Sequence, residues 1–205
     1  MPEAMDSAEQ LLVNRKQARY FDEVVELFDQ EPPPHIMRNL EAIVEAAEIQ
    51  PGDSVLDVGA GTGVLVPLIR AFKPGRILAC DISSRMLARL GEKYPDVETH
   101  LSDIVEMGLE DNSLNVIFMN AVFPNLVDKP RALGNCARML APSGRLIISH
   151  PEGRQFVERI KEVVPFPIDP LPIFPQLKRL LRNLPFLLTR YQDRSDLYLA
   201  VLERR

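Results

Sequence analysis

The sequence predicts an α/β protein in which helices cover both faces of a mostly parallel β-sheet. Short runs of apolar and β-branched residues recur between residues 54 and 149, and stretches with helical periodicity separate most of them. These runs are apolar almost throughout instead of alternating with polar residues, which indicates strands that are buried on both faces. Strands of that kind, alternating with helices along the chain, are typical of a layered α/β domain.

Two helices are expected before the first strand. Residues 8–30 place aromatic and aliphatic side chains at helical spacing, and Pro32-Pro33-Pro34 ends the pattern because proline lacks an amide proton. A second amphipathic helix is expected over 35–48. We expect residues 1–50 to form an N-terminal helical cap.

The central region supplies five strands and three helices. The expected strands are 54–58, 76–81, 97–101, 114–119 and 145–149, and the expected helices are 63–72, 84–93 and 129–140. Residues 51–205 should form a single structural domain together with the cap.

The last quarter of the chain has a different pattern. A helix over 153–162 is followed by a proline-rich insertion, 163–175, that suits neither a helix interior nor a central strand. After a short helix at 176–184, the runs 185–192 and 196–203 predict an antiparallel C-terminal hairpin. The insertion is interpreted either as a lid or substrate wall or as a plain connector.

Composition and charge narrow the function classes. The chain has 205 residues, 46% of them hydrophobic, and a net charge of −5, as expected of an ordinary globular protein. Residues 1–152 carry a net charge of −9 and residues 153–205 carry +4, so most of the chain is a poor partner for nucleic acid. No apolar run is long enough to span a membrane, and the acidic start does not resemble a leader peptide. We therefore expect a cytoplasmic protein without integral membrane association.

The strongest motif is a glycine-rich loop directly after the first strand. Asp57 lies near the end of that strand, and Gly59, Gly61 and Gly63 follow at alternate positions before a helix. Glycines let the backbone turn sharply and approach a ligand, towards which the helix directs its amide protons. Val64 stands where a dinucleotide-binding fingerprint requires its third glycine, and the lysine of a P-loop is missing.

This pattern resembles that of the class I S-adenosylmethionine (SAM)-dependent methyltransferases, and the resemblance covers residues 20–152 well. It implies a Rossmann-like three-layer αβα sandwich with strand order 3-2-1-4-5-7-6. It also implies that Asp57 positions the methionine amine of SAM, against which the loop backbone at Gly59, Ala60, Gly61 and Gly63 lies. S-adenosylhomocysteine would be the product.

Further acidic residues follow the second and third strands, where this family binds the nucleoside. The resemblance implies that Asp81 bonds the ribose hydroxyls, that Ile82 packs on the adenine, and that Asp103, with Ile104 beside it, accepts from the adenine amino group. Asn120, at the end of the fourth strand, would line the methyl-donor pocket. Residues 132–146 resemble the family's helix, tight turn and fifth strand. As an alternative, Asp57 and Asp81 are ordinary helix-capping residues.

The methyl acceptor is less well defined by the sequence. His150 ends the fifth strand and is the candidate catalytic base, with His35 as a weaker candidate for substrate contact. Tyr20, Phe21 and Phe123 are candidate substrate contacts, with core packing as the alternative for the first two. Cys80 and Cys136 are expected in the core, not as nucleophiles. No metal ligand set is recognisable.

The sequence therefore predicts transfer of a methyl group from SAM to a small, apolar or aromatic molecule. The overall pattern is similar to the methyltransferases of quinone biosynthesis. Two alternatives stay open: a protein or RNA methyltransferase, for which only residues 153–205 are basic, and a SAM-binding regulatory protein without turnover. The oligomeric state is left open.

Overall fold

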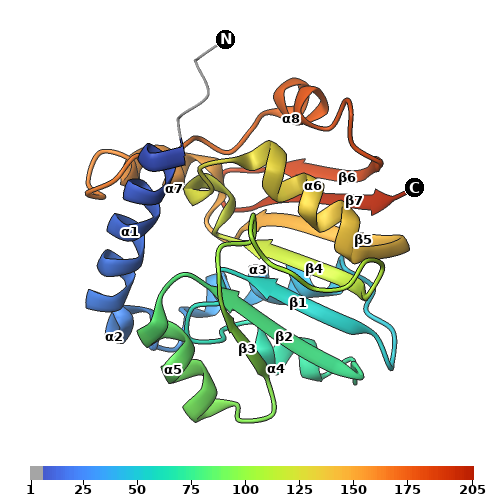
Figure 1. Cartoon of the computed structure of the whole chain (residues 1–205), viewed down its shortest axis with the longest axis horizontal. Coiled ribbons are helices and arrows are strands. Elements are labelled where there is room, and N and C mark those ends of the chain that lie inside the picture. Colours follow the sequence, from blue (N-terminus) through green and yellow to red (C-terminus); the bar gives the residue numbers. More distant parts are fainter. Residues whose placement is uncertain (1–6) are drawn as a thin grey trace.

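A computed structural model describes residues 7–205, which form a seven-stranded sheet between two layers of helices (Figure 1). The first six residues of the expected cap lie outside this range. The strands are β1 (Ser54–Val58), β2 (Arg76–Asp81), β3 (Glu98–Leu101), β4 (Leu114–Asn120), β5 (Leu140–His150), β6 (Phe186–Asp193) and β7 (Tyr198–Arg204). Their order, β3-β2-β1-β4-β5-β7-β6, confirms the predicted fold class.

The sheet is parallel from β3 to β5, and β7 then runs antiparallel to both β5 and β6. The predicted C-terminal hairpin is therefore confirmed, with its turn closed by a hydrogen bond from the Arg194 amide to the Leu197 carbonyl. In this topology the carboxyl ends of β1, β2, β3 and β4 lie along one edge of the sheet, where open α/β sheets bind ligands.

Alternate residues of the central strands point into two separate hydrophobic cores. Leu56 and Val58 of β1 belong to one core, and Val55 belongs to the other. The first core includes buried residues of α6 (Lys129–Met139), α7 (Gly153–Ile160) and α8 (Phe174–Leu180). The second includes residues of α3 (Pro34–Glu45), α4 (Val66–Arg70) and α5 (Ser84–Lys93). Burial on both faces explains why these strands read as continuous apolar runs.

The expected helix over 8–30 is broken in two. It consists of α1 (Ser7–Glu23) and α2 (Val25–Phe28), with Val24 outside the helical backbone conformation. Tertiary contacts redirect the chain here, because the Phe28 carbonyl accepts from the Thr62 hydroxyl and Asp29 pairs with Lys93 and Arg89. The following helix, α3, begins at Pro34, one residue before its expected start, and ends at Glu45 instead of residue 48.

Two boundaries in the central region also differ from the expectation. The helix expected at 63–72 is shortened to α4, because Gly63 has a φ of 87° and residues 61–65 form turns. The strand expected at 145–149 begins earlier, because Leu140 already pairs with Leu114 and the intervening residues form a bulge in which Ser143 has a φ of 63°.

The proline-rich insertion, 163–175, contains no helix or strand before α8 begins at Phe174. That helix was expected to start at residue 176, but it starts at Phe174. Pro175 is suited to the first turn of a helix, because amides in that turn have no hydrogen-bond partner within the helix. The Gln176 side chain then accepts from the Ile173 amide and fixes the start of the helix.

Candidate active site

The glycine loop after β1 is held tightly against its neighbours. Gly59 has a φ of 67°, and a Cβ atom added to it would lie 2.4 Å from a methyl group of Val122. The amides of Gly59 and Ala60 both donate to the Cys80 carbonyl, at 2.7 and 3.2 Å. A larger residue at position 59 would be strained and would displace Val122, so the close packing of this loop requires glycine.

Asp57 lies in β1 with only 2% of its surface exposed, and its Oδ2 atom has no hydrogen-bond partner among the described residues. Burial, and secondly the charge of Asp81, raises the pKa of the Asp57 carboxyl from 3.8 to about 8. A buried carboxylate with a free oxygen is costly unless a cation or donor pairs with it. The site therefore favours a cationic or hydrogen-bonding group beside Asp57.

Asp81 is the last residue of β2, and its side chain bonds to the loops that follow β1 and β2. Its Oδ2 accepts from the Gly61 amide and its Oδ1 from the Ser83 amide, both at 2.9 Å. Burial raises the pKa of this carboxyl, although the amide bonds oppose the shift. A carboxylate has about four acceptor positions, so Asp81 retains capacity for a further donor. Ile82, the next residue, is partly exposed beside it.

Asp103 follows β3 and is bonded to a residue of α1. Its Oδ2 accepts from the Asn14 side-chain amide at 2.6 Å, and its Oδ1 accepts from the Val105 amide at 2.9 Å. The neighbouring Ile104 is buried in the core. Asn14 thus presents an amide donor to the carboxylate that was expected to accept from the adenine amino group.

The end of β4 contributes a buried polar pair. Asn120 is buried, and its Oδ1 accepts from the Ser149 hydroxyl of β5 at 3.0 Å. Ala121 then has a φ of 57°, which turns the chain sharply away from the strand. Phe123, expected as a substrate contact, is fully buried and packs in the first hydrophobic core.

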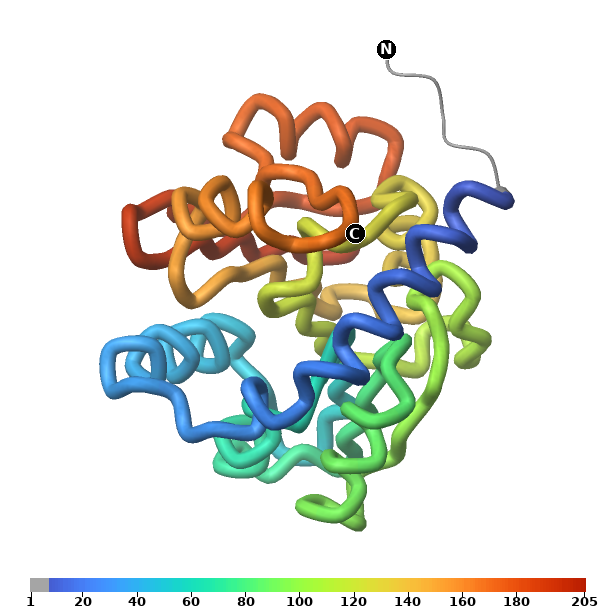
Figure 2. The backbone as a smooth tube through the Cα atoms, turned by 90° about the vertical axis from the view of Figure 1, so that its left-hand side faces the viewer, coloured from blue at the N-terminus to red at the C-terminus, as the bar shows by residue number. Residues whose placement is uncertain are grey.

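Helix α1 crosses the edge at which these acidic residues meet (Figure 2). The Gln17 side chain donates to the Asn125 carbonyl at 2.9 Å, and Asp22 accepts from the Ser83 hydroxyl at 2.6 Å. Together with the Asn14–Asp103 bond, these contacts join α1 to the loops after β2, β3 and β4. The helix is positioned as a cover over the carboxyl ends of the strands.

Three aromatic rings meet where α1 contacts the proline-rich insertion. The ring centroid of Phe166 lies 5.4 Å from that of Tyr20 and 5.9 Å from that of Phe21. The insertion is fastened in place, because buried Lys129 donates to Asp169 at 2.7 Å and the Tyr198 hydroxyl donates to the Pro172 carbonyl at 2.9 Å. These contacts argue against a mobile lid, and they leave a substrate wall and a plain connector as the alternatives for the insertion.

His150 ends β5 and is buried. Burial lowers the pKa of its imidazole to about 4, so the ring is neutral at pH 7. Its Nδ1 accepts from the Glu152 amide at 3.2 Å, and this bond assigns the proton of the neutral ring to Nε2. The arrangement favours hydrogen-bond donation by Nε2 over proton abstraction. His35, the weaker candidate, is exposed at the surface.

Both cysteines are buried, and burial raises the pKa of each thiol. Within residues 7–205 no group of three or more histidine, cysteine or acidic side chains is arranged to hold a metal ion. None of the helices in that range is long and apolar enough to cross a membrane.

Comparison with known proteins agrees with this geometry. The family described as a methyltransferase domain matches residues 56–148, which contain the glycine loop, Asp81 and Asp103. The demethylmenaquinone methyltransferase of Paenarthrobacter aurescens is 27% identical over 199 residues, which cover 89% of this chain and 71% of that protein. A probable SAM-dependent methyltransferase of Mycobacterium tuberculosis is 34% identical over 97 residues, or 47% of this chain and 35% of that protein.

The fold is shared with solved structures. A SAM-dependent methyltransferase from Aquifex aeolicus superposes with a TM-score of 0.72 at 19% identity, over 90% of this chain and 98% of that structure. Residues 56–148 therefore form a methyltransferase domain, and the chain has the fold of the class I SAM-dependent methyltransferases. It spans only about a third of the length of several curated relatives that it matches.

The described residues suit SAM, because the unpartnered oxygen of Asp57 would pair with an ammonium group such as the methionine amine. Three residues beside the proposed SAM site were not predicted from the sequence: Asn14, Gln17 and Phe166. Asn14 and Gln17 are three residues apart on α1, and Phe21 follows four residues later. This helical spacing on one face was a signal that could have identified Asn14 and Gln17. Nothing in the sequence around Phe166 indicated its aromatic partners.

Proposed function

We propose that the protein transfers a methyl group from SAM to a small, apolar or aromatic acceptor. The observation that carries the proposal is the buried Asp57 oxygen without a partner, beside the glycine loop and Asp81. In the proposed complex Asp57 pairs with the amine of SAM, Asp81 accepts from the ribose hydroxyls, and Asp103 faces the adenine. The bound SAM supplies an electrophilic methyl group on a sulfonium.

Two features support an apolar or aromatic acceptor. Tyr20 and Phe21 lie on α1 between Asn14 and Asp22, both of which bond to loops around the proposed SAM site. Phe166 brings the insertion into contact with the same two rings. These rings would exclude water and hold the acceptor, so the chain mainly supplies alignment.

We further propose that His150 contacts the acceptor as a hydrogen-bond donor. A neutral imidazole whose Nδ1 is already bonded has an Nε2–H group to offer. This role suits an acceptor with a carbonyl or phenolate oxygen. Proton abstraction by His150 is the competing hypothesis. His35 is a weaker candidate for contact with the acceptor.

The decisive experiment incubates the purified protein with methyl-labelled SAM and extracts of small metabolites, proteins and RNA in separate reactions. Label in an extractable small molecule supports the proposal, whereas label in protein or RNA alone would contradict it. The Asp57→Asn variant serves as a control, because its side chain cannot ionise beside the amine of SAM. SAM binding without transfer to any fraction would instead support a regulatory protein.

A further inference from the structure

Helix α1 is bonded to both loops that carry the acids proposed to bind the nucleoside of SAM. Asn14, near the middle of the helix, bonds directly to Asp103, and Asp22, near its end, bonds to the loop after β2. Between them, the Gln17 side chain has 2% of its surface exposed and donates to the Asn125 carbonyl. That buried bond fixes the helix to the loop after β4, so Asn14 and Asp22 are held in place.

The carboxyl group of Asp103 has a donor on each of its oxygens. The Asn14 side-chain amide donates to Oδ2 at 2.6 Å, and the Val105 amide donates to Oδ1 at 2.9 Å. Val105 belongs to the same loop as Asp103, whereas Asn14 is 89 residues away in the chain. A carboxylate has about four acceptor positions, so these bonds leave capacity for the adenine amino group. Asn14 therefore supplies the one tertiary bond that fixes the direction of this carboxylate.

Asp81 is connected to α1 through Ser83. The Ser83 amide donates to Oδ1 of Asp81 at 2.9 Å, and the Ser83 side chain is fully buried. The Ser83 hydroxyl accepts from the Met86 amide at 3.1 Å and donates to Asp22 at 2.6 Å. The Arg85 amide donates to the same oxygen of Asp22 at 3.0 Å. Asp22 thus holds the loop from which the Ser83 amide reaches Asp81.

The charge of Asp22 is unfavourable at Asp81. Burial raises the pKa of the Asp81 carboxyl, and the charge of Asp22 adds to that rise because two carboxylates repel each other. The contribution of Asp22 to this loop is its oxygen, which accepts from both Ser83 and Arg85. The carbonyl oxygen of an asparagine can accept the same two bonds without the charge.

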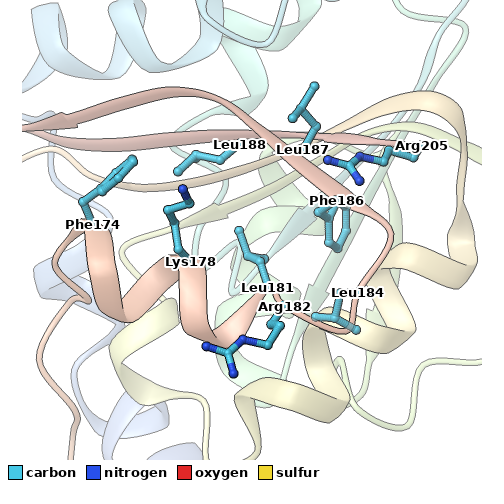
Figure 3. A pocket seen from close by; sticks show the side chains of 9 residues that line it. All are labelled: Phe174, Lys178, Leu181, Arg182, Leu184, Phe186, Leu187, Leu188 and Arg205. Atoms are coloured by element: carbon cyan, nitrogen blue, oxygen red, sulfur yellow. The ribbon is translucent and has the colours of Figure 1, made fainter.

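The surface cavity between α8 and β6 shows no comparable convergence of polar groups (Figure 3). It has a volume of about 360 Å³. Its cationic side chains, Lys178, Arg182 and Arg205, point apart, so they do not form a site for one anion. At α1, in contrast, side chains from distant parts of the chain are joined by short hydrogen bonds.

We propose that Asn14 and Asp22 are positioning residues for the nucleoside of SAM. Asn14 directs Asp103 towards the adenine amino group, and Asp22, through Ser83, directs Asp81 towards the ribose hydroxyls. The inference rests on the proposed function, in which Asp81 and Asp103 bind SAM. Because a carboxylate held in one direction discriminates better between donors and acceptors than a mobile one, α1 sets the selectivity of the site for base and sugar.

Calorimetric titration of the full chain with S-adenosylhomocysteine and two analogues measures this selectivity. S-inosylhomocysteine has an oxygen in place of the adenine amino group, so it cannot donate to Asp103 there. The 2′-deoxy analogue of S-adenosylhomocysteine lacks one of the hydroxyls proposed to donate to Asp81. In the wild type each change should weaken binding about tenfold or more, as expected for the loss of a hydrogen bond to a charged group.

The wild type separates failure of this inference from failure of the proposed function. No binding of S-adenosylhomocysteine by the wild type would refute the proposed function and this inference together. Tight binding of S-adenosylhomocysteine without preference over either analogue would leave SAM binding intact and overturn the inference alone.

Variants of Asn14 test the selectivity for adenine. Asn14→Ala and Asn14→Asp should each reduce the preference for S-adenosylhomocysteine over S-inosylhomocysteine about fivefold or more, with the preference for ribose unchanged. Aspartate has the shape of asparagine but, when ionised, no proton to donate, so it separates the hydrogen bond from packing. Lys16→Ala, at an exposed position of the same helix, should keep both preferences. Wild-type preferences in Asn14→Asp, or tighter binding of S-adenosylhomocysteine by Asn14→Ala, would overturn the role of Asn14.

Variants of Asp22 test the selectivity for ribose. Asp22→Ala should reduce the preference for S-adenosylhomocysteine over its 2′-deoxy analogue about fivefold or more and leave the preference for adenine unchanged. Asp22→Asn should keep both preferences, because its carbonyl oxygen still accepts from Ser83 and Arg85. Glu23→Gln is the matched control, since it changes an exposed carboxylate of the same helix into an amide. Weakening of all three ligands by the same factor would overturn the proposal, because a role in folding alone changes every affinity equally.

Discussion

Replacing Asp57 by asparagine should change how the stability of the protein depends on pH. Burial raises the pKa of this carboxyl from 3.8 to about 8, so the folded chain keeps a proton that the unfolded chain releases. Below pH 3.8 both states are protonated and the group has no effect on stability. Between that pH and about 8 the unfolded state binds fewer protons, so the free energy of unfolding falls as pH rises.

The size of the effect follows from the same shift. Each unit of pKa difference corresponds to about 1.4 kcal/mol. The contribution of Asp57 should therefore lower the free energy of unfolding of the ligand-free protein by about 4 kcal/mol at pH 7, compared with acidic solution. Asparagine has nearly the same shape and no charge. The Asp57→Asn variant should therefore match the wild type near pH 4 and be several kcal/mol more stable near pH 8 in the absence of SAM.

Urea denaturation of both proteins at a series of pH values measures this difference directly. Taking the difference between variant and wild type removes the contributions of the other titrating groups. Identical pH profiles for the two proteins would refute the assignment of a proton to Asp57.

The variant should also bind SAM more weakly by about 1.5–3 kcal/mol, the value of a hydrogen bond to a charged group. At pH 7, SAM binding to the wild type should release about 0.9 proton, measured by calorimetry in buffers of different ionisation enthalpy.

Three further predictions concern the same site and its cover. Asp81→Ala should weaken SAM binding by about 1–3 kcal/mol, because it leaves hydrogen-bonding groups unpaired; unchanged calorimetric affinity would remove the ribose role. Gly59→Ala should destabilise the protein and abolish SAM binding, since its Cβ would meet Val122 at 2.4 Å, whereas Gly91→Ala, where nothing lies within 4 Å, should have no such effect; equal unfolding midpoints would contradict this. His150→Asn should reduce turnover far more than SAM affinity, and a matching loss of both would place His150 outside the acceptor pocket.

Much of the fold and of the proposed SAM site followed from the sequence because both depend on local patterns. Apolar runs of strand length and the spacing of Gly59, Gly61 and Gly63 are visible without tertiary information. Acids at the ends of successive strands must meet at one edge once the strands are parallel, so Asp57, Asp81 and Asp103 could be placed in advance. The boundaries that differed were those at which tertiary contacts overcame local preference, as at Val24.

The sequence by itself determined the fold class, the strand order by family resemblance, and the residues proposed to contact SAM. Only the tertiary structure showed that α1 bonds to Asp103 through Asn14 and that Phe166 meets Tyr20. It also showed the cavity beside Lys178 and Arg182. These features join residues far apart in the chain, and a periodic pattern carries no information about such pairs. The proposed roles of the acidic residues 1–152 could be predicted from local motifs. The role of the basic residues 153–205 depends on which side chains folding brings together.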